Sequence, residues 1–385
     1  MSTHRVEIIE IQAINGHLNA DRLELATVQG WQIVVGKGNF KPGELALYVP
    51  VDSVLPNSLE ERLFPPGSKI TLKKGRIRSI KIRGQMSQGM LIPLSEVVAE
   101  LNAQAAGGSD WVESDILLGD DFASLLNITK YEPPEPEFAG STNNTKKASK
   151  NQINPNFKKY TDIENIKWYT NVFKEGEMVY ISEKLHGTSA RFGYVPRHYE
   201  GFLAPLRTAV MGQLAKWGIV KSHQFVYGSR NVQLHTGSNK SWYAEDVYSK
   251  ILKQENIQER LLPGECIYGE IVGHNIQKNY SYGCKEGEHK FYVYDVMVDG
   301  KFLDYPAFAR WCSNRGFEPV PKLYVGPWSA EVHMKHRDGD STIGGQKVRE
   351  GVVVKSVVDE ESICGRKVLK SISDAYYLED NTDFH

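Results

Sequence analysis

One lysine of this sequence stands in a context that suits nucleophilic chemistry. Lys184 lies within the hexapeptide Glu183–Thr188, between an apolar run that ends beside it and a second run over residues 188–194. A lysine amine attacks only when it is neutral, and its ordinary pKa is about 10.4, so such a site needs other cations or a metal ion nearby. Gly187 would let a phosphate group approach the backbone. The hexapeptide alone does not decide the question, because Lys81 also lies three residues before a glycine.

Later segments carry side chains that could complete a nucleotide site. In chain order they are Gly228–Asn231, Tyr268–Gly273, Phe291–Asp295, Glu350–Lys355 and Lys367–Ser371. They offer, in turn, a guanidinium for phosphate, a carboxylate for ribose hydroxyls, aromatic rings for a purine, a carboxylate with a lysine on one strand, and further cations. Each has an ordinary alternative: Tyr292 and Tyr294 could be core residues, Glu350 a solvated acid and Lys370 a surface lysine. Their joint occurrence behind Lys184 favours one shared site.

The order of these segments resembles motifs I, Ia, III, IIIa, IV and V of the covalent nucleotidyltransferases, the group that contains polynucleotide ligases and mRNA capping enzymes. Within this group, the run Lys184–Thr188 and the ending Lys370–Leu378 resemble RNA ligases. Gly30–Gln32 and Val51–Pro56 are similar to the N-terminal module of the Naegleria and Deinococcus type of RNA ligase. The resemblance spans most of the chain except the linker described below and an insert at residues 201–220.

The resemblance implies that Lys184 takes AMP from ATP in a phosphoramide linkage. The ATP contacts that it implies come from Glu183, Leu185, Arg230, Asn231, Glu270, Tyr294, Lys355, Lys367 and Lys370. Tyr294 would stack on the adenine, with Tyr292 as the alternative. The candidate ligands for Mg²⁺ or Mn²⁺ are Glu350, Glu270 and His186.

Two positions depart from the family pattern. Many ligases carry Asp where this chain has His186, so the part of this residue in the metal shell is left open. The last motif usually has two lysines one residue apart, whereas Lys370 has no such neighbour, and Lys367 or Arg366 would supply the second charge. The implied reaction joins an RNA 3′-hydroxyl to a 5′-phosphate in nicked duplexes. AMP passes from the lysine to the 5′-phosphate, and the 3′-hydroxyl then displaces it.

The elements that position these residues form two expected domains and an α+β fold. Residues 1–130 are rich in short β-type runs separated by turn signals and predict an OB-fold β-barrel. Residues 131–159 are rich in Pro, Ser, Thr, Asn and Lys, have little to bury and predict a linker. Residues 160–385 mix strand patterns with helical ones, including a surface helix at 247–261, and predict a nucleotidyltransferase domain built on antiparallel sheets with flanking helices.

The first domain contains a basic segment without acids. Its candidate RNA-binding residues are Lys69, Lys73, Lys74, Arg76, Arg78, Lys81 and Arg83. Apolar residues alternate with these cations, a pattern that predicts a half-buried strand pair whose outer side contacts phosphates. A solvated basic face without a partner is the alternative interpretation.

Composition narrows the remaining classes. The formal net charge of −1 predicts no partner by itself, and the four cysteines lack metal-site spacing, so we expect reduced thiols and no structural zinc. No apolar run approaches the roughly 20 residues of a membrane span, and the N-terminus lacks a signal-peptide stretch. We therefore expect a cytoplasmic monomer whose partner is RNA and that does not associate with membranes.

Two other functions compete with RNA ligation. DNA ligases and capping enzymes usually place their OB domain after the last motif, and this sequence ends 15 residues beyond Lys370, which argues against them. A noncatalytic RNA-binding protein would be expected to have lost the nucleophile or the acid of motif IV, yet Lys184 and Glu350 are both present. A P-loop ATPase is excluded, because the spacing of Gly30 and Gly36 is wrong and no Ser or Thr follows Lys37.

Overall fold

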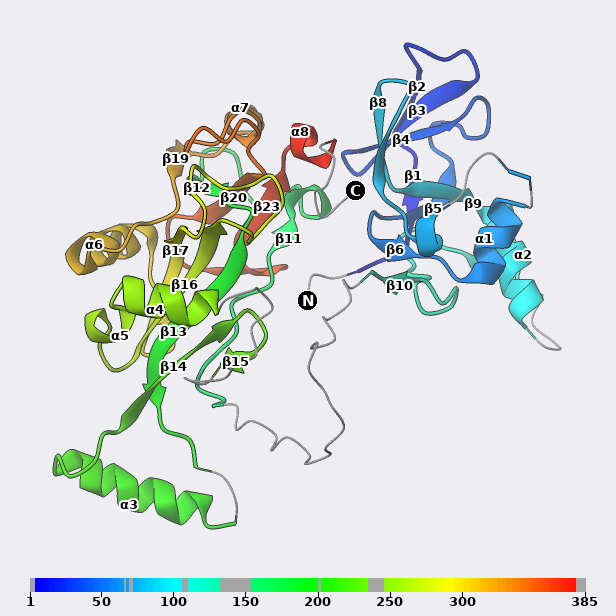
Figure 1. Ribbon diagram of the computed structural model, residues 1–385. Helices are drawn as coiled ribbons and strands as arrows, with labels where there is room; N and C mark the ends of the chain where they lie inside the picture. Colours follow the sequence, from blue (N-terminus) through cyan, green and yellow to red (C-terminus); the bar gives the residue numbers. More distant parts are fainter. Residues whose placement is uncertain are drawn as a thin grey trace. The chain divides into compact units, whose positions relative to one another are not determined.

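The computed structural model describes residues 4–65, 67–68, 72–105, 110–131, 154–199, 202–234 and 246–378 (Figure 1). The chain forms two compact units. One contains the described parts of residues 1–134, 166–168 and 374–385, and the other those of 135–165 and 169–373. We call them the N-terminal unit and the catalytic unit. None of the helices in the described ranges is long and apolar enough to cross a membrane.

The N-terminal unit is built from short, mainly antiparallel strands. They are β1 (Glu7–Glu10), β2 (Ala13–Gly16), β3 (Leu23–Val28), β4 (Trp31–Gly36), β5 (Leu45–Val49), β6 (Ser53–Val54), β7 (Ser79–Ile82), β8 (Gln85–Gln88), β9 (Met90–Pro93) and β10 (Thr129–Lys130). They pair as β1-β5-β9, β2-β3-β4, β7-β8 and β6-β10. In β4 buried and half-buried residues alternate, as a strand with one face in the core requires. Helices α1 (Asn57–Leu63) and α2 (Leu94–Gln104) complete this core.

A short piece of chain from beyond the predicted linker, residues 166–168, also belongs to this unit. The ring of Trp168 packs 6.1 Å from that of Trp31 and 5.7 Å from that of Tyr48, measured between centroids. Lys167 lies over the Trp31 ring at 4.4 Å, and its ammonium donates a hydrogen bond to Gln88. Helix α8 (Asp374–Tyr377) contributes further buried tyrosines.

The catalytic unit contains two larger sheets. The five-stranded sheet has the order β11-β23-β20-β12-β19 and the six-stranded sheet the order β15-β14-β13-β16-β17-β18. Their strands are β11 (Glu164–Asn165), β12 (Met178–Lys184), β13 (Thr188–Pro196), β14 (His223–Ser229), β15 (Gln233–Leu234), β16 (Glu265–Gly273), β17 (His289–Val298), β18 (Lys301–Phe302), β19 (Lys322–Pro327), β20 (Gly351–Ser356) and β23 (Val368–Ile372); β21 (Glu361–Ser362) and β22 (Gly365–Arg366) form a separate hairpin. Sheets and helices together confirm the α+β class.

Helices cover the six-stranded sheet. The main core packs residues of β13, β16 and β17 against α4 (Val247–Gln254), α5 (Ile257–Arg260) and α6 (Tyr305–Arg315). The helix predicted at 247–261 is not continuous. Asn256 adopts a left-handed conformation with φ of 46°, which divides the segment into α4 and α5, while Ile251 and Ile257 are fully buried, as the apolar face of a surface helix requires. The other helices are α3 (Ala204–Lys216) and α7 (Ala330–Arg337).

The basic segment of the N-terminal unit differs from the predicted strand pair. Among the described residues of this segment, only Ser79–Ile82 forms a strand, and its partner is β8, which lies beyond the segment. Residues 73–75 form a tight turn in which Lys74 has a φ of 57° and Gly75 one of 67°. Alternation of apolar and basic residues alone did not reveal this turn, because Gly75 interrupts the extended backbone.

Candidate active site

The proposed nucleophile meets an acid that lies 166 residues further along the chain. Lys184 ends β12 and pairs with Gly351 of β20, while Glu350 directly precedes that strand. The ammonium of Lys184 donates to Oε1 of Glu350 at 2.5 Å. The Glu350 side chain is only 5% exposed, and its Oε2 atom is buried with no hydrogen-bond partner among the described residues. The register between β12 and β20 therefore brings the lysine of motif I and the acid of motif IV together.

A second carboxylate holds the loop after the nucleophile. The backbone N–H of Gly187 donates to Oε1 of Glu270 at 3.1 Å. A Cβ atom at Gly187 would overlap the carbonyl oxygen of Ile271 and lie 2.9 Å from Cγ of Glu270. Glycine is required here because the loop between β12 and β13 passes directly against β16.

The electrostatics of Glu270 favour a nearby cation. Burial raises the pKa of Glu270 to about 8; the positive charge of Lys184 lowers it and the negative charge of Glu350 raises it. The unpartnered Oε2 of Glu350 adds a second acceptor that lacks a donor. Both acids therefore fit as oxygen ligands of Mg²⁺ or Mn²⁺. No cluster of three His, Cys, Asp or Glu side chains with metal geometry occurs among the described residues, so phosphates and water would have to supply the other ligands.

His186 is part of the packing around the loop. Its backbone N–H donates to the hydroxyl of Tyr282 at 2.7 Å, and its ring meets the Tyr280 ring edge-on at 4.9 Å. Gln277 donates to the carbonyl of Gly187 at 3.0 Å. The sequence did not predict these loop-holding residues, because Gln277, Tyr280 and Tyr282 lie in a segment without a motif. The structure does not bring the His186 ring into a three-ligand cluster with Glu270 and Glu350.

Tyr294 and Arg230 lie near Glu270. The hydroxyl of Tyr294 shares a hydrogen bond of 2.8 Å with Ser189, which the sequence did not single out. Burial raises the pKa of Tyr294, the nearby charge of Glu270 raises it further, and Arg230 lowers it, so these side chains lie within electrostatic reach of one another. Arg230 forms an ion pair with Asp162. Asn231, which follows Arg230, is exposed.

The two tyrosines of the aromatic motif differ in burial. Tyr292 is 3% exposed and burial raises its pKa to about 12, whereas Tyr294 is only half-buried. Tyr294 is also the extra residue of a bulge, because Tyr268 pairs with Asp295 and Gly269 with Val293. The bulge directs the Tyr294 ring toward Ser189 and leaves its carbonyl for a partner outside the sheet.

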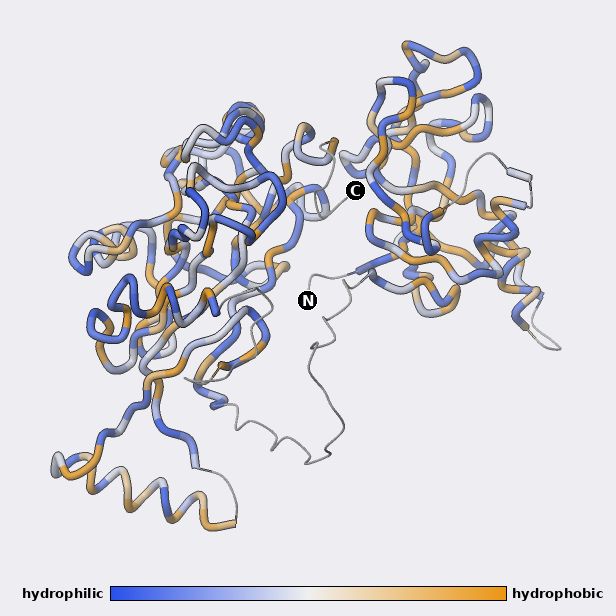
Figure 2. Tube along the Cα trace, viewed as in Figure 1, coloured by the Kyte–Doolittle hydropathy of each residue, from blue (hydrophilic) through white to orange (hydrophobic). Residues whose placement is uncertain are grey.

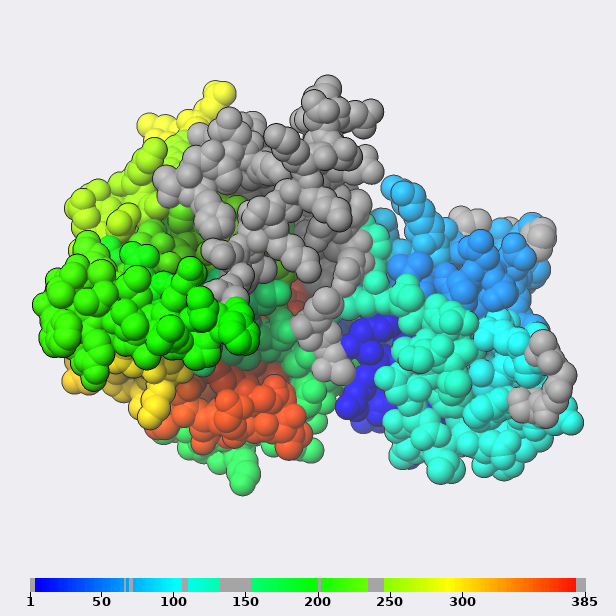
Figure 3. All heavy atoms as spheres, turned by 90° about the horizontal axis from the view of Figure 1, so that it is seen from below, coloured from blue at the N-terminus to red at the C-terminus, as the bar shows by residue number. Residues whose placement is uncertain are grey.

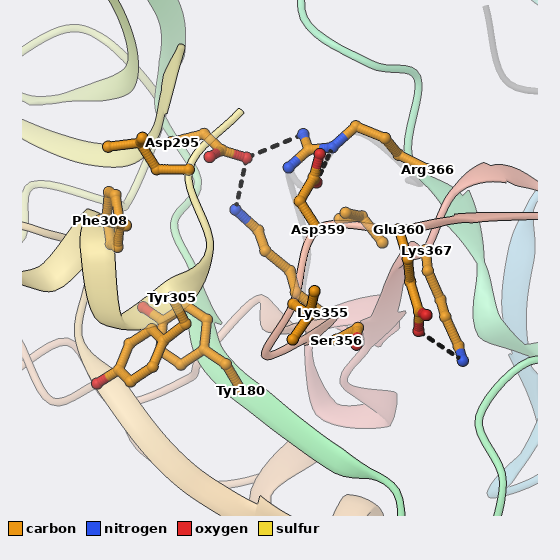
Figure 4. A pocket seen from close by; sticks show the side chains of 13 residues that line it. Tyr180, Asp295, Tyr305, Phe308, Lys355, Ser356, Asp359, Glu360, Arg366 and Lys367 are labelled. Atoms are coloured by element: carbon orange, nitrogen blue, oxygen red, sulfur yellow. Dashed lines mark hydrogen bonds and ion pairs between the residues drawn. The ribbon is translucent and has the colours of Figure 1, made fainter. Parts of the chain in front are cut away.

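That partner is Lys355. Its ammonium donates to the Tyr294 carbonyl at 2.6 Å. It also donates to Oδ2 of Asp295 at 3.0 Å (Figure 4). The same Oδ2 accepts from Arg366 at 3.0 Å and from Tyr160 at 2.8 Å. Burial alone would raise the pKa of Asp295, but Lys355 and Arg366 hold it below its usual range. We call Asp295, Lys355, Arg366 and Tyr160 the Asp295 network.

The Asp295 network links the two sheets of the catalytic unit, since Lys355 lies on β20 and Asp295 on β17. Asp295, Lys355 and Arg366 line a small, partly open pocket (Figure 4), with a volume of about 20 Å³. A cavity of this size holds about one water molecule and excludes a nucleotide. The phosphate contact predicted for Lys355 would require its ammonium to leave Asp295, so in this structure the residue connects the sheets. Its role toward ATP stays a prediction.

The other predicted ATP contacts divide between the two sides of the five-stranded sheet. Lys184 pairs with Gly351, and Gly351 pairs with Ile372 on its other side. Lys370 lies two positions before Ile372 on β23, and residues two apart on a strand point to the same face. Lys370 therefore shares the face of Lys184. The ammonium of Lys367 instead bonds Glu177 at 2.6 Å and Glu360 at 3.0 Å.

The neighbours of Lys184 in the hexapeptide turn away from it. The carboxylate of Glu183 accepts from the backbone N–H and the hydroxyl of Thr342 at 2.9 and 2.8 Å. Leu185 is buried. Only Oε2 of Glu183 is engaged in this way, since its Oε1 is buried without a hydrogen-bond partner among the described residues. The ATP contacts of Glu183 and Leu185 stay predictions.

The basic residues of the N-terminal unit are not equivalent. Arg76 is buried, forms an ion pair with Asp52 at 2.6 Å and lies 3.8 Å from the centre of the Tyr131 ring. Arg78 is half-buried. The exposed cations are Lys73, Lys74, Lys81 and Arg83, whereas Lys69 lies outside the described residues. Arg76 therefore stabilises the unit, and the exposed four are better placed for phosphates.

Comparisons with known proteins identify the family and the fold. A family model described as RNA ligase matches residues 177–372, and a model of an OB-fold domain matches residues 5–94. The OB-fold predicted for the N-terminal unit is thereby confirmed. No protein in a search of curated sequences matched this chain.

Solved structures share the fold over nearly the whole chain. A mutant of the Naegleria gruberi RNA ligase with ATP and Mn is 22% identical, with a TM-score of 0.66 over 96% of this chain and 97% of that one. The same ligase with pyrophosphate is 21% identical, with a TM-score of 0.64 over 97% and 98% of the two chains. An apo mutant of it is 23% identical, with a TM-score of 0.67 over 98% of each chain.

Proposed function

Since this chain belongs to the RNA ligase family, we propose that it seals RNA with ATP, through a lysyl-AMP intermediate on Lys184 and an adenylylated 5′-phosphate. The observation that carries this proposal is the meeting of Lys184 with Glu350 and Glu270, from three separate motifs. A noncatalytic RNA-binding protein would have no need for two desolvated carboxylates beside a half-buried lysine. ATP and Mn are bound by the solved Naegleria ligase that shares this fold, which supports the same nucleotide and metal here.

The residues of this chain have separable tasks in the proposed reaction. Lys184 attacks the α-phosphorus of ATP, its nitrogen–phosphorus bond forms as the bond to pyrophosphate breaks, and the lysine proton leaves. Glu350 and Glu270 would hold a divalent cation, which would stabilise charge on the phosphate oxygens. Tyr294 faces the base, and the cations Arg230 and Lys370 offset the phosphate charge.

Transfer to RNA uses the same site. An RNA 5′-phosphate displaces the lysine from AMP, and an RNA 3′-hydroxyl then displaces AMP to close the strand. We propose a nicked duplex as the substrate, with phosphates held by the exposed cations of the N-terminal unit: Lys73, Lys74, Lys81 and Arg83. The OB-fold itself supports this assignment, because such barrels bind oligonucleotides.

Retention of label tests the first step. Protein incubated with ATP labelled at the α-phosphate and Mg²⁺ should retain label after denaturation, and Lys184→Ala should retain none. Lys81→Ala is the matched control, because Lys81 has the same spacing to a glycine but lies in the other unit. Without RNA in the assay, this control should be labelled like the wild type. Label on Lys184→Ala would remove the assigned nucleophile.

A sealing assay tests the substrate. Nicked duplexes that differ only in ribose or deoxyribose at the 3′-hydroxyl end should be sealed at different rates, with ribose preferred. Equal sealing of both would favour a DNA ligase over the proposed RNA ligase.

A further inference from the structure

Helix α3 is a helix without a core. Its 13 residues lie between β13 and β14, and none of them is buried. Figure 1 shows α3 at the far end of the hairpin that these two strands form, away from the sheets of the catalytic unit. Ser189 and Arg230 lie at the opposite end of the same hairpin. An isolated helix of this length is marginal in water, so α3 needs a partner surface.

Large apolar side chains are exposed along α3 and at its ends. They are Phe202 (99% exposed), Leu203 (53%), Leu206 (61%), Val210 (48%), Trp217 (71%) and Ile219 (64%). Figure 2 shows hydrophobic positions along this helix, and Figure 3 shows its side chains on the surface of the catalytic unit. Leu203, Leu206, Val210 and Trp217 are spaced by three, four and seven residues. At 3.6 residues per turn this spacing puts them in one stripe, which we call the α3 stripe.

The exposed area is large enough for a dimer. The six side chains together expose on the order of 700 Å², from the usual areas of such residues. Two copies would then bury roughly 1,200 Å², at the lower end of specific protein interfaces. A single chain rarely exposes an apolar patch of this size without a partner.

We propose that α3 pairs with α3 of a second copy of this chain, in antiparallel orientation, with Val210 near the two-fold axis. In this register Leu203 faces Trp217 and Leu206 faces Leu214 of the other copy. The stripe is thereby complementary to itself, as a two-fold interface requires. This dimer would replace the monomer expected from the sequence.

The charges favour the antiparallel orientation. No acid occurs between residues 201 and 244, while α3 carries Arg207 and Lys216. A parallel pair would place each of these cations opposite its own copy. In the antiparallel register Arg207 lies opposite Gln213 and Lys216 opposite Ala204, so no like charges meet.

Aliphatic residues decide between a second copy and RNA. The basic residues of the insert would suit a phosphate backbone, but Leu203, Leu206 and Val210 gain little from contact with phosphates. Burial against another apolar stripe removes apolar surface from water, which stabilises the pair by about 25 cal/mol per Å². A phosphate backbone offers no such gain.

Cross-linking tests the register. In a background with Cys284→Ser and Cys364→Ser, which removes the partly exposed native thiols, Val210→Cys should form a disulfide-linked dimer under mild oxidation. Thr208→Cys is the matched control, since residue 208 is exposed on the opposite side of α3 and should not cross-link. Equal cross-linking of both variants would overturn the proposed register.

Sedimentation velocity tests the dimer itself. The wild-type mass should rise from one chain toward two with concentration, Leu206→Lys should stay at one chain, and Thr208→Lys should behave like the wild type. Both variants should retain adenylylation, which shows that they fold. A wild type that remains a monomer at all concentrations would overturn the proposal. The proposal would also be overturned if Leu206→Lys dimerised like the wild type but bound a nicked RNA duplex more weakly. The stripe would then contact RNA.

Discussion

Replacement of Lys355 by methionine separates two roles for this residue. The family pattern predicts a contact with ATP phosphates, whereas the structure gives the ammonium to Asp295 and to the carbonyl of Tyr294. If Lys355 only contacts ATP phosphates, its replacement should leave the free energy of unfolding of the ATP-free protein nearly unchanged. If Lys355 instead joins β20 to β17, its replacement should lower the free energy of unfolding even without ATP.

The magnitude follows from the contacts. Lys355→Met removes two charge-assisted hydrogen bonds from an environment in which the Lys355 side chain is 11% and that of Asp295 3% exposed. Loss of one partner of a buried pair usually costs about 3 to 5 kcal/mol. Asp295 keeps Arg366 and Tyr160 as donors, so we expect a smaller loss, about 2 to 3 kcal/mol.

The loss should depend on pH in a defined direction. The pKa of Asp295 is depressed in the folded protein, so its contribution is present above the unfolded value of about 3.9 and is lost as the pH falls through the folded value. The difference between wild type and Lys355→Met should therefore be full at pH 7 and shrink below about pH 4.

Urea unfolding without nucleotide, followed by tryptophan fluorescence, measures the difference. Lys322→Met is the control, because Lys322 is exposed on the edge strand β19 and should change stability by less than about 0.5 kcal/mol. If Lys355→Met unfolds like Lys322→Met while its KM for ATP rises, the linking role is refuted and the phosphate role stands.

Three further perturbations address the active site. Glu350→Gln removes the partner of Lys184 and the like charge near Glu270, so label transfer from ATP should fall by at least tenfold while urea unfolding still shows a folded protein; unchanged labelling would contradict the role of Glu350. The pKa of Glu270 is raised, so in the absence of metal and ATP the folded protein holds a proton that the unfolded chain releases. The free energy of unfolding should therefore fall as the pH rises from about 5 to 8. Glu270→Gln should flatten this pH profile, and an equal slope in both proteins would contradict the assignment. Gly187→Ala should abolish labelling and cost about 1 to 3 kcal/mol in urea unfolding, because its Cβ would overlap the Ile271 carbonyl, whereas wild-type stability would show that the loop can move.

Motif order predicted the acids that meet the nucleophile. Lys184, Glu350 and Glu270 are far apart in the sequence, and their type and order were enough to place them together. Lys184 ends β12 and Glu350 directly precedes β20, whereas Glu270, predicted at a strand end, lies within β16. The partners of the cations could not be predicted in this way. Whether Lys355 faces a phosphate or Asp295 depends on the bulge at Tyr294, which shifts the register of β17 by one residue.

Local exceptions to periodicity account for the elements that were predicted wrongly. The apolar pattern over 247–261 is helical throughout, but Asn256 takes a left-handed conformation that the pattern does not encode. The α3 stripe was equally visible as spacing in the sequence, yet only the structure shows that no residue of this helix is buried by the described part of the catalytic unit. Periodicity predicts which face is apolar, and the fold determines what covers it.

The ion pair between Lys184 and Glu350 sets a requirement for the chemistry. A carboxylate 2.5 Å from the amine favours the ammonium form, which cannot attack phosphorus. The burial of Glu350 and its unpartnered Oε2 atom make this carboxylate a ready acceptor for a second cation. A divalent ion at Glu350 would draw its charge away from Lys184 and favour loss of the lysine proton. Metal binding and activation of the nucleophile would then be one event, and the loss of label transfer in Glu350→Gln would reflect both.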